Sequence, residues 1–215
     1  MTPRLRPTPV TLALATVFAS ACAAHAAPVQ WKVEDGGNGH FYDFIAYPVF
    51  QSISWDTARD HAATQSYGGA RGHLTTITSA AEQAFFASLP RQTNWVYYLG
   101  ASQDFTATKS DEGWSWVTGE PWDYTAWATL NGLRMEPSDT VGGIYPGMED
   151  GTENYLSTYA NPAGNYSMWN DIGGIRGGGV YRYAIEFPVP EPSSAAALAA
   201  LTGLVLLRRT PGTPR

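Results

Sequence analysis

Cysteine is nearly absent from this sequence, since Cys22 is the only one among 215 residues. A chain with one thiol cannot close an internal disulfide, so its hydrophobic core must hold the fold. The four histidines, His25, His40, His61 and His73, are scattered along the chain. A zinc site therefore has too few ligands at useful spacing.

The common signatures of nucleophilic catalysis and of phosphate binding are also missing. The chain contains no Gly-x-Ser-x-Gly elbow and no phosphate loop, and its glycine-rich run over 173–179 precedes a strand pattern, which indicates a turn. We therefore expect the protein not to be an enzyme. Glycoside hydrolysis remains an open alternative, because any two carboxylates can meet in a fold.

Basic residues are scarce between residues 28 and 188, where 8 Lys and Arg are outnumbered by 18 Asp and Glu. Nucleic acids and anionic lipids need a basic face, so this balance excludes them as partners. Ten of the acids lie between Asp104 and Glu153, with only Lys109 and Arg134 among them. Acidic loops are most often solvated, but they also supply the oxygen ligands of a hard cation.

The N-terminal end has the pattern of a secretory signal peptide. A basic start is followed by an apolar stretch over 10–18 and by the small-residue string Ala24-His25-Ala26. We expect residues 1–26 to be removed, which leaves no thiol. The alternative is a lipoprotein signal with lipid on Cys22, but Ala19 stands where a bulky aliphatic residue is usual.

The C-terminal end combines Pro190-Glu191-Pro192, an apolar stretch from Ala195 to Leu207, and Arg208-Arg209. A helix over that stretch measures about 20 Å, short of the ~30 Å hydrocarbon core of a membrane. Residues 189–215 resemble the PEP-CTERM sorting signal. The resemblance implies processing by an exosortase-type protease, transient contact with the inner membrane, and a Gram-negative bacterium that makes exopolysaccharide. An ordinary tail anchor is the alternative.

The first half of the domain predicts two helices. One begins after the N-cap Ser54 and runs to Gln65, and the other begins at Ser79 with a capping box that includes Glu82. Each has an apolar stripe at helical spacing: Trp55, Ala58 and Ala62 on the first, and Phe85, Phe86 and Leu89 on the second.

The rest of the domain has strand and loop patterns. Strands are predicted over 41–49, 95–99, 114–117 and 180–187, and in the last of these apolar and other residues alternate. Residues 118–170 are aromatic, acidic and rich in Gly and Pro, with little periodicity. A loop of this length inside a compact domain is normally functional, and the alternative is that part of it has been wrongly assigned as loop.

An ordered set of short motifs resembles the C-type lectin-like domain over about 140 residues. These motifs are Trp55, Gly72 to Ile77, Ser79 to Phe86, Tyr98-Leu99-Gly100, Trp114-Ser115-Trp116, Tyr124 to Trp127, Glu136-Pro137, Glu153 to Leu156, Trp169-Asn170-Asp171 and Ala184 to Pro188. The resemblance implies an α+β fold in which two helices flank small antiparallel sheets, the terminal strands pair, and a long loop binds ligand. The family usually has two disulfides, whereas here Tyr155 and Ile185 stand where cysteines are expected.

The same resemblance implies a calcium site. Carried over by position, its ligands are Glu136, Glu153, Asn170 and Asp171, with Ser138 in place of the expected Asn. Calcium takes six to eight oxygens, so backbone carbonyls, water or two sugar hydroxyls would complete the shell.

Two further sets of residues extend this hypothesis. We expect an aromatic ring, Tyr145 or Tyr166, to cover the apolar face of a bound sugar. A second cation site is predicted from Asp104, Glu112 and Asp139.

The sequence therefore predicts a secreted, calcium-dependent carbohydrate-binding module of the extracellular or biofilm matrix. The alternative is a lectin-like scaffold that binds protein or matrix polymer without metal, and the Ser138 substitution favours it.

Overall fold

The structure is a computed structural model that describes residues 27–47, 52–90, 96–139, 152–159, 168–173 and 182–189. The predicted signal peptide and nearly all of the predicted sorting tail lie outside these residues. None of the helices in the described part is long and apolar enough to span a membrane.

The two predicted helices are confirmed. Helix α1 covers Trp55–Thr64 and helix α2 covers Ala80–Ser88, and the N-cap side chains Ser54 and Ser79 accept hydrogen bonds from the backbone N–H groups of Thr57 and Glu82. The capping box of α2 is only half formed, because the Glu82 carboxylate accepts from the backbone N–H of Thr78. Phe86 and Leu89 are buried as predicted, whereas Phe85 is half-buried and stacks on Trp31.

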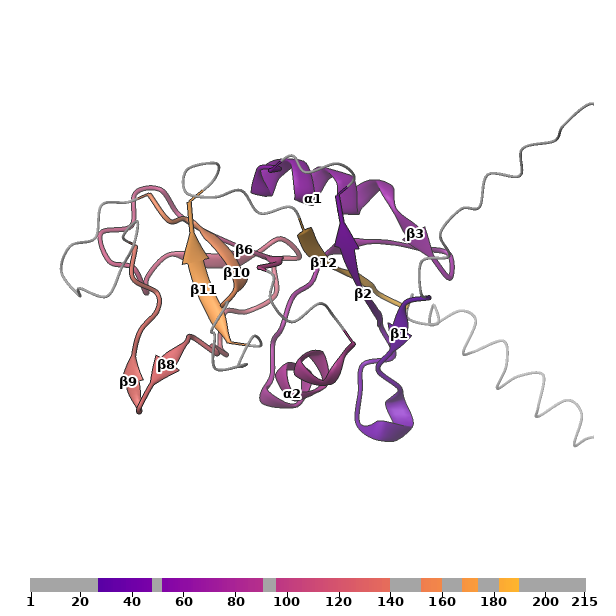
Figure 1. Cartoon of the computed structure of the whole chain (residues 1–215). Coiled ribbons are helices and arrows are strands. Elements are labelled where there is room, and N and C mark those ends of the chain that lie inside the picture. Colours follow the sequence, from indigo (N-terminus) through magenta and orange to yellow (C-terminus); the bar gives the residue numbers. More distant parts are fainter. Residues whose placement is uncertain are drawn as a thin grey trace, which may run out of the picture.

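Eight strands form the main sheet, with the order β1-β2-β12-β6-β10-β11, β5 paired with β12 and β7 paired with β6. Their bounds are Val29–Gln30 (β1), Phe41–Ala46 (β2), His73–Leu74 (β5), Tyr98–Gln103 (β6), Trp114–Trp116 (β7), Tyr155–Thr158 (β10), Trp169–Ile172 (β11) and Arg182–Phe187 (β12). Two small hairpins, β3 (Ser66–Tyr67) with β4 (Ala70–Arg71) and β8 (Thr129–Leu130) with β9 (Leu133–Arg134), and the 3-10 turn Val33–Asp35 complete the described elements. Figure 1 shows α1 and α2 on opposite sides of the central strands.

The terminal strands of the domain pair with each other, as the sequence predicts. Strand β12 lies antiparallel to β2 over six residue pairs, from Arg182 opposite Ala46 to Phe187 opposite Phe41. The alternation in this strand suggested two different faces, but five of its six residues, Tyr183 to Phe187, are buried. The reason is its central position: β12 has β2 on one side and β5 and β6 on the other, with helices above and below.

Two apolar clusters form the core without a disulfide. One gathers Phe86, Leu99, Leu156 and six tryptophans, four buried and two partly buried, around α2, and the other gathers Trp55, Leu74, Tyr98 and Tyr183 against α1. The two positions where cysteines were expected belong to the second cluster: Ile185 is fully buried and Tyr155 stacks on Trp55 at 5.1 Å between ring centroids. Aromatic and aliphatic packing thus occupies the space that a cross-link would otherwise take.

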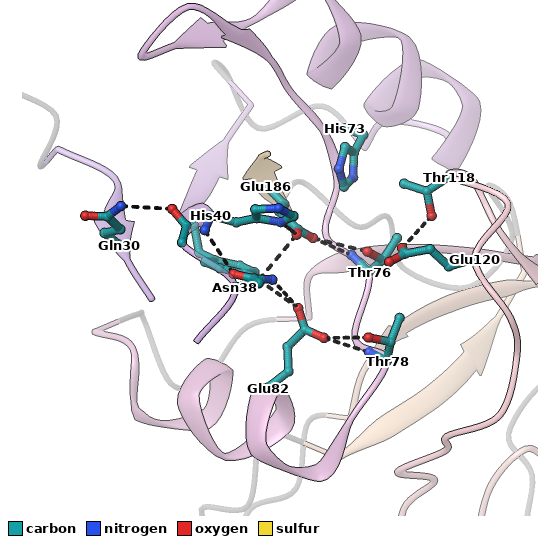
Figure 2. A network of polar contacts seen from close by, with 12 residues as sticks. Gln30, Asn38, His40, His73, Thr76, Thr78, Glu82, Thr118, Glu120 and Glu186 are labelled. Carbon is teal, nitrogen blue, oxygen red and sulfur yellow. Dashed lines mark hydrogen bonds and ion pairs between the residues drawn. The ribbon is translucent and has the colours of Figure 1, made fainter. Parts of the chain in front are cut away.

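A buried polar network ties β12 to α2 and to the loop before β2 (Figure 2). The Glu186 carboxylate accepts from His40, Tyr42 and Thr76, and the Glu82 carboxylate accepts from Tyr42, Asn38 and Thr78. Both glutamates are almost fully buried. No sequence pattern predicted this network, because its members are far apart along the chain.

Candidate carboxylate site at the end of β10 and β11

The long loop reaches β11 through main-chain hydrogen bonds. The N–H group of Trp169 on β11 donates to the carbonyl of Ala126 at 2.8 Å. The N–H group of Ala128 in turn donates to the carbonyl of Trp169 at 2.9 Å. The carbonyl of Ala128 then accepts from the N–H groups of Met135 and Glu136, at 2.9 and 3.2 Å, across the β8–β9 hairpin. These bonds place Glu136 next to β11, the strand that contains Asp171.

Tryptophan packing supports this loop. The ring of Trp169 is fully buried and lies edge-on to those of Trp116 and Trp127, at 5.5 and 5.7 Å between centroids. Its indole N–H donates to the side chain of Gln83 on α2 at 2.8 Å. Trp169 is therefore part of the core, and it fixes the start of β11 next to the site.

The segment after Glu136 wraps around the Asp171 carboxylate. The Glu136–Pro137 peptide bond is cis, and Asp139 has a left-handed backbone with φ of 49°. The N–H groups of Ser138 and Asp139 donate to the two oxygens of Asp171, at 2.9 Å to Oδ1 and 2.6 Å to Oδ2. Each Asp171 oxygen thus has one backbone donor.

Glu153 enters the same cluster from the other side. Its backbone N–H donates to Oδ1 of Asp139 at 3.0 Å, and its carboxylate lies 3.5 Å from the hydroxyl of Ser138. The side chains of Glu136, Ser138, Asp139, Glu153 and Asp171 therefore meet, although they come from two stretches of the long loop and from β11.

Glu136 and Asp171 have altered acidity. Burial, followed by the nearby charge of Asp171, raises the pKa of Glu136 to about 8, and the hydroxyl of Ser138 opposes that rise. Burial also raises the pKa of Asp171, against the N–H groups of Ser138 and Asp139, which lower it. Two carboxyl groups in contact cannot both ionise at low cost, so the pair holds a proton near neutral pH.

One oxygen of Glu136 stands out among the described residues. Its Oε2 is buried and has no hydrogen-bond partner there, and the residue as a whole is 7 % exposed. A buried oxygen without a donor costs free energy unless a ligand or an ion satisfies it. The structure thus leaves one strong oxygen ligand available in this cluster.

The predicted calcium ligands are only partly assembled. Glu136, Ser138, Glu153 and Asp171 come together, while the Asn170 amide donates to the main-chain oxygen of Asp171 at 2.6 Å. Within the described ranges, no group of three or more His, Cys, Asp or Glu is arranged to hold a metal ion. The carboxylates bond each other, backbone groups and Ser138.

The residues of the predicted second cation site are divided. Asp139 lies in the cluster around Asp171, whereas Asp104 and Glu112 belong to the exposed loop between β6 and β7. There, Asp104 accepts from the N–H and hydroxyl of Thr106, and Glu112 pairs with Lys109. Tyr145 and Tyr166, the predicted sugar-facing rings, lie outside the described residues.

Sequence reasoning missed two features of this site: the donors on Asp171 and the position of Asp139. Both depend on the backbone turn after Pro137, since a main-chain N–H leaves no mark in residue identity. The only signal was the string Glu136-Pro137-Ser138-Asp139 itself, in which a proline precedes two residues with short oxygen-bearing side chains.

Comparisons with known proteins agree with this architecture. Residues 51–143 match the family model described as Lectin C-type domain. With two helices, small antiparallel sheets and paired terminal strands, the chain has an α+β fold of the C-type lectin-like kind. The structure therefore confirms the predicted fold class.

Three known proteins are similar to this chain, and the matched part covers a different share of each. Halomucin of Haloquadratum walsbyi (strain DSM 16790 / HBSQ001) is 32% identical over 139 residues, which are 62% of this chain and 1% of Halomucin. The C-type lectin CEL-I from Cucumaria echinata is 21% identical, with a TM-score of 0.48 over 76% of this chain and 98% of its own. The cow C-type carbohydrate-recognition domain of CD23, solved in the presence of a GlcNAc2Man3 oligosaccharide, is 19% identical, with a TM-score of 0.46 over 71% and 90%.

Proposed function

We propose that this protein is a calcium-dependent carbohydrate-binding module, in which the cluster around Glu136 and Asp171 holds the cation. The match to the C-type lectin domain supports carbohydrate binding in general, and a binding role over a catalytic one. The calcium dependence rests on this chain's own carboxylates.

The buried Oε2 of Glu136 is the observation that carries the proposal. The Glu136 carboxyl lies beside a second carboxylate, Asp171, whose oxygens are already held by backbone donors. A proton relieves the repulsion between the two groups in the absence of metal, and a divalent cation would relieve it more strongly. Hard oxygen ligands of this type select calcium or magnesium over zinc or copper.

Each residue of the cluster has its own part in the proposed site. Glu136, Asp171 and Glu153 supply charge, and Ser138 supplies a hydroxyl between them. Ser138 and Asp139 orient Asp171 through their N–H groups, so its carboxylate is fixed before any ion arrives. When bound, calcium supplies open coordination positions that two adjacent sugar hydroxyls can take.

We also propose that the module acts outside the cell. The predicted signal peptide over 1–26 and the predicted sorting tail over 189–215 support secretion followed by processing with an exosortase-type protease. A module delivered in this way would meet the exopolysaccharide of the surrounding matrix. Detection of the mature protein in culture medium, with both ends mapped by mass spectrometry, tests this localisation.

Isothermal titration calorimetry with calcium chloride tests the metal site. The purified protein is expected to bind with saturable heat, and Asp171→Asn, which keeps the shape but removes the charge, is expected to lose that heat. Glu34→Gln, at an exposed acid remote in sequence and engaged with Lys32, is the matched control and should titrate like the unmodified protein. If no heat of binding is detected at millimolar calcium, the proposed metal site is wrong.

A glycan array probed in calcium and again in chelator tests the sugar part separately. Signals that vanish in chelator are expected. An array in which every signal is equal in both buffers would favour the alternative, a lectin-like scaffold that binds polymer or protein without metal. The hydroxyl of Ser138, a weaker ligand than an amide oxygen, is the observation that favours this second candidate.

A further inference from the structure

A row of aromatic rings runs from the core cluster against α1 to the surface at the β6–β7 loop. Phe105 lies edge-on to Tyr155, with 6.2 Å between ring centroids and an angle of 76°. Tyr155 stacks on Trp55 at 5.1 Å, and the guanidinium carbon of Arg59 lies 5.5 Å from the centroid of the Trp55 ring. Phe105 forms the outer end of this row and is 71 % exposed.

The loop that presents Phe105 is held in place by hydrogen bonds. Asp104 accepts from Thr106 through both the backbone N–H and the hydroxyl, at 2.8 Å each. From β6, the amide of Gln103 donates to the carbonyls of Lys109 and Glu112, at 2.7 and 2.8 Å. A loop fixed before binding loses little conformational freedom when a ligand covers it.

Polar groups lie beside the aromatic row. The guanidinium of Arg59 pairs with Asp56 at 2.9 Å and with Asp60 at 2.8 Å. Asp56 and Arg59 also lie close enough to the Tyr155 hydroxyl to act on its pKa, which burial raises first, Asp56 raises further and Arg59 lowers. The surface thus combines an exposed ring with hydroxyl, carboxylate and guanidinium groups.

This surface is separate from the carboxylate site. Tyr155 pairs with Ile172 across β10 and β11, and the next pair along, Leu156 with Asp171, has its side chains on the opposite face because strand side chains alternate. Tyr155 and Ile172 pack with the α1 cluster, while Leu156 packs with the tryptophans near Asp171. A ligand on the aromatic row would therefore not need the cation.

We propose that the surface formed by Phe105, Tyr155, Asp56 and Arg59 is a second, metal-independent binding site for a neutral polysaccharide. A pyranose ring has an apolar C–H face and a rim of hydroxyl groups, which fits an exposed aromatic ring beside hydrogen-bonding side chains. Arg59 is outnumbered at this surface by three acids, its partners Asp56 and Asp60 and the neighbour of Phe105, Asp104, so a polyanion would be repelled. A purely apolar protein partner would leave the Asp56–Arg59 pair covered without compensation.

Affinity electrophoresis in gels that contain a neutral mannan, galactan or glucan, all run in EDTA, tests this site. At least one polysaccharide is expected to retard the full-length protein in chelator. Phe105→Ala should weaken that retardation roughly five- to tenfold, and Phe105→Trp should keep it. Val33→Ala, which removes another exposed apolar side chain, is the control and should have no effect.

Two results would overturn the proposal: no retardation by any of the three polymers in EDTA, or equal retardation of Phe105→Ala and the unmodified protein. Sedimentation velocity is run in parallel, because a concentration-dependent dimer that Phe105→Ala abolishes would assign the ring to self-association instead. All of these measurements are made without calcium. A negative result would therefore contradict only the aromatic site, and a negative calcium titration would contradict only the carboxylate site.

Discussion

The described part of the molecule contains two pairs of buried carboxylates, and they are built in opposite ways. Glu82 and Glu186 lie between α2 and β12, where each of their four oxygens accepts at least one hydrogen bond. Glu136 and Asp171 lie at the end of the long loop, where Oε2 of Glu136 has no partner among the described residues. The first pair is saturated with donors, whereas the second is one donor short.

The difference separates structural acids from acids available to a ligand. A buried carboxylate surrounded by donors stabilises the elements that supply them, and any additional ligand must displace an existing bond. A carboxylate that lacks donors and touches another acid destabilises the metal-free protein and gains from a cation. The two pairs are equally acidic in composition, so only their partners distinguish them.

The largest effect should follow from removing a saturated acid. Glu186→Ala leaves Tyr42, Thr76 and His40 without their shared acceptor, and we expect it to lower the free energy of unfolding by about 3 kcal/mol. In the metal-free protein, Glu136→Gln should keep or raise stability, because a neutral amide ends the repulsion with Asp171. Urea denaturation in chelator measures the free energy of unfolding of both variants. Equal decreases in the two variants would contradict the distinction between the two pairs.

The next effect should come from calcium itself. At a concentration 100-fold above its dissociation constant, calcium should add about 2.7 kcal/mol to the free energy of unfolding. Glu136→Gln should remove most of that gain, whereas Glu82→Gln, although it lowers the starting stability, should keep it. Thermal unfolding of the three proteins with and without calcium gives the six values, and a calcium gain that survives Glu136→Gln would place the ion elsewhere.

A smaller effect, on the order of 1 to 2 kcal/mol, should appear as a pH dependence of the metal-free protein. The pKa of Glu136 is raised from 4.5 to about 8 in the fold, so its contribution to stability is full below pH 4.5 and is lost as the pH rises through 8. The pKa of His40 is also raised, chiefly by its hydrogen bond to Glu186, so its contribution is full below pH 6.5 and falls above it.

The difference between the unmodified protein and Glu136→Gln isolates the Glu136 part, because His40 is present in both. Denaturation midpoints from pH 4 to pH 9 in chelator provide this comparison. Parallel curves for the two proteins would mean that Glu136 does not titrate in this range.

The smallest effect should come from the altered ligand. Ser138→Asn offers an amide oxygen in place of a hydroxyl, and we expect calcium affinity to rise about fivefold, which corresponds to ~1 kcal/mol. Ser138→Ala should lower the affinity, since it also removes the hydroxyl that lies near Glu153. Calorimetric titration orders the three proteins, and an Asn variant weaker than Ser would mean that residue 138 does not face the ion.

The sequence predicted the fold well because its signals are local. Ser54 and Ser79 mark helix starts through their own side chains, and the ordered strings from Trp55 to Phe187 resemble one known architecture. The β12 strand was only partly understood, because burial on both faces depends on which strands and helices surround it. The burial of Glu186, which is 2 % exposed, therefore did not follow from the alternation along this strand.

The candidate site was harder to predict than the fold. The residue types predicted five oxygen ligands: Glu136, Ser138, Glu153, Asn170 and Asp171. The side chains of all but Asn170 come together in the structure. The residue types could not predict the hydrogen-bond partner of each oxygen. They did not indicate the backbone donors on Asp171 or the bond from Asn170 to a main-chain carbonyl. Nor did they indicate that Oε2 of Glu136 has no donor among the described residues. These depend on loop conformation, which carries no periodic signal.

The absence of a cross-link also has a practical consequence for where this domain can fold. Its long loop is joined to β11 by main-chain hydrogen bonds at Ala126 and Ala128 and by packing around Trp169. None of these contacts depends on the redox potential of the surroundings. The domain should therefore fold alike in a reducing cytoplasm and in an oxidising exterior, and a reducing agent should leave its melting temperature unchanged.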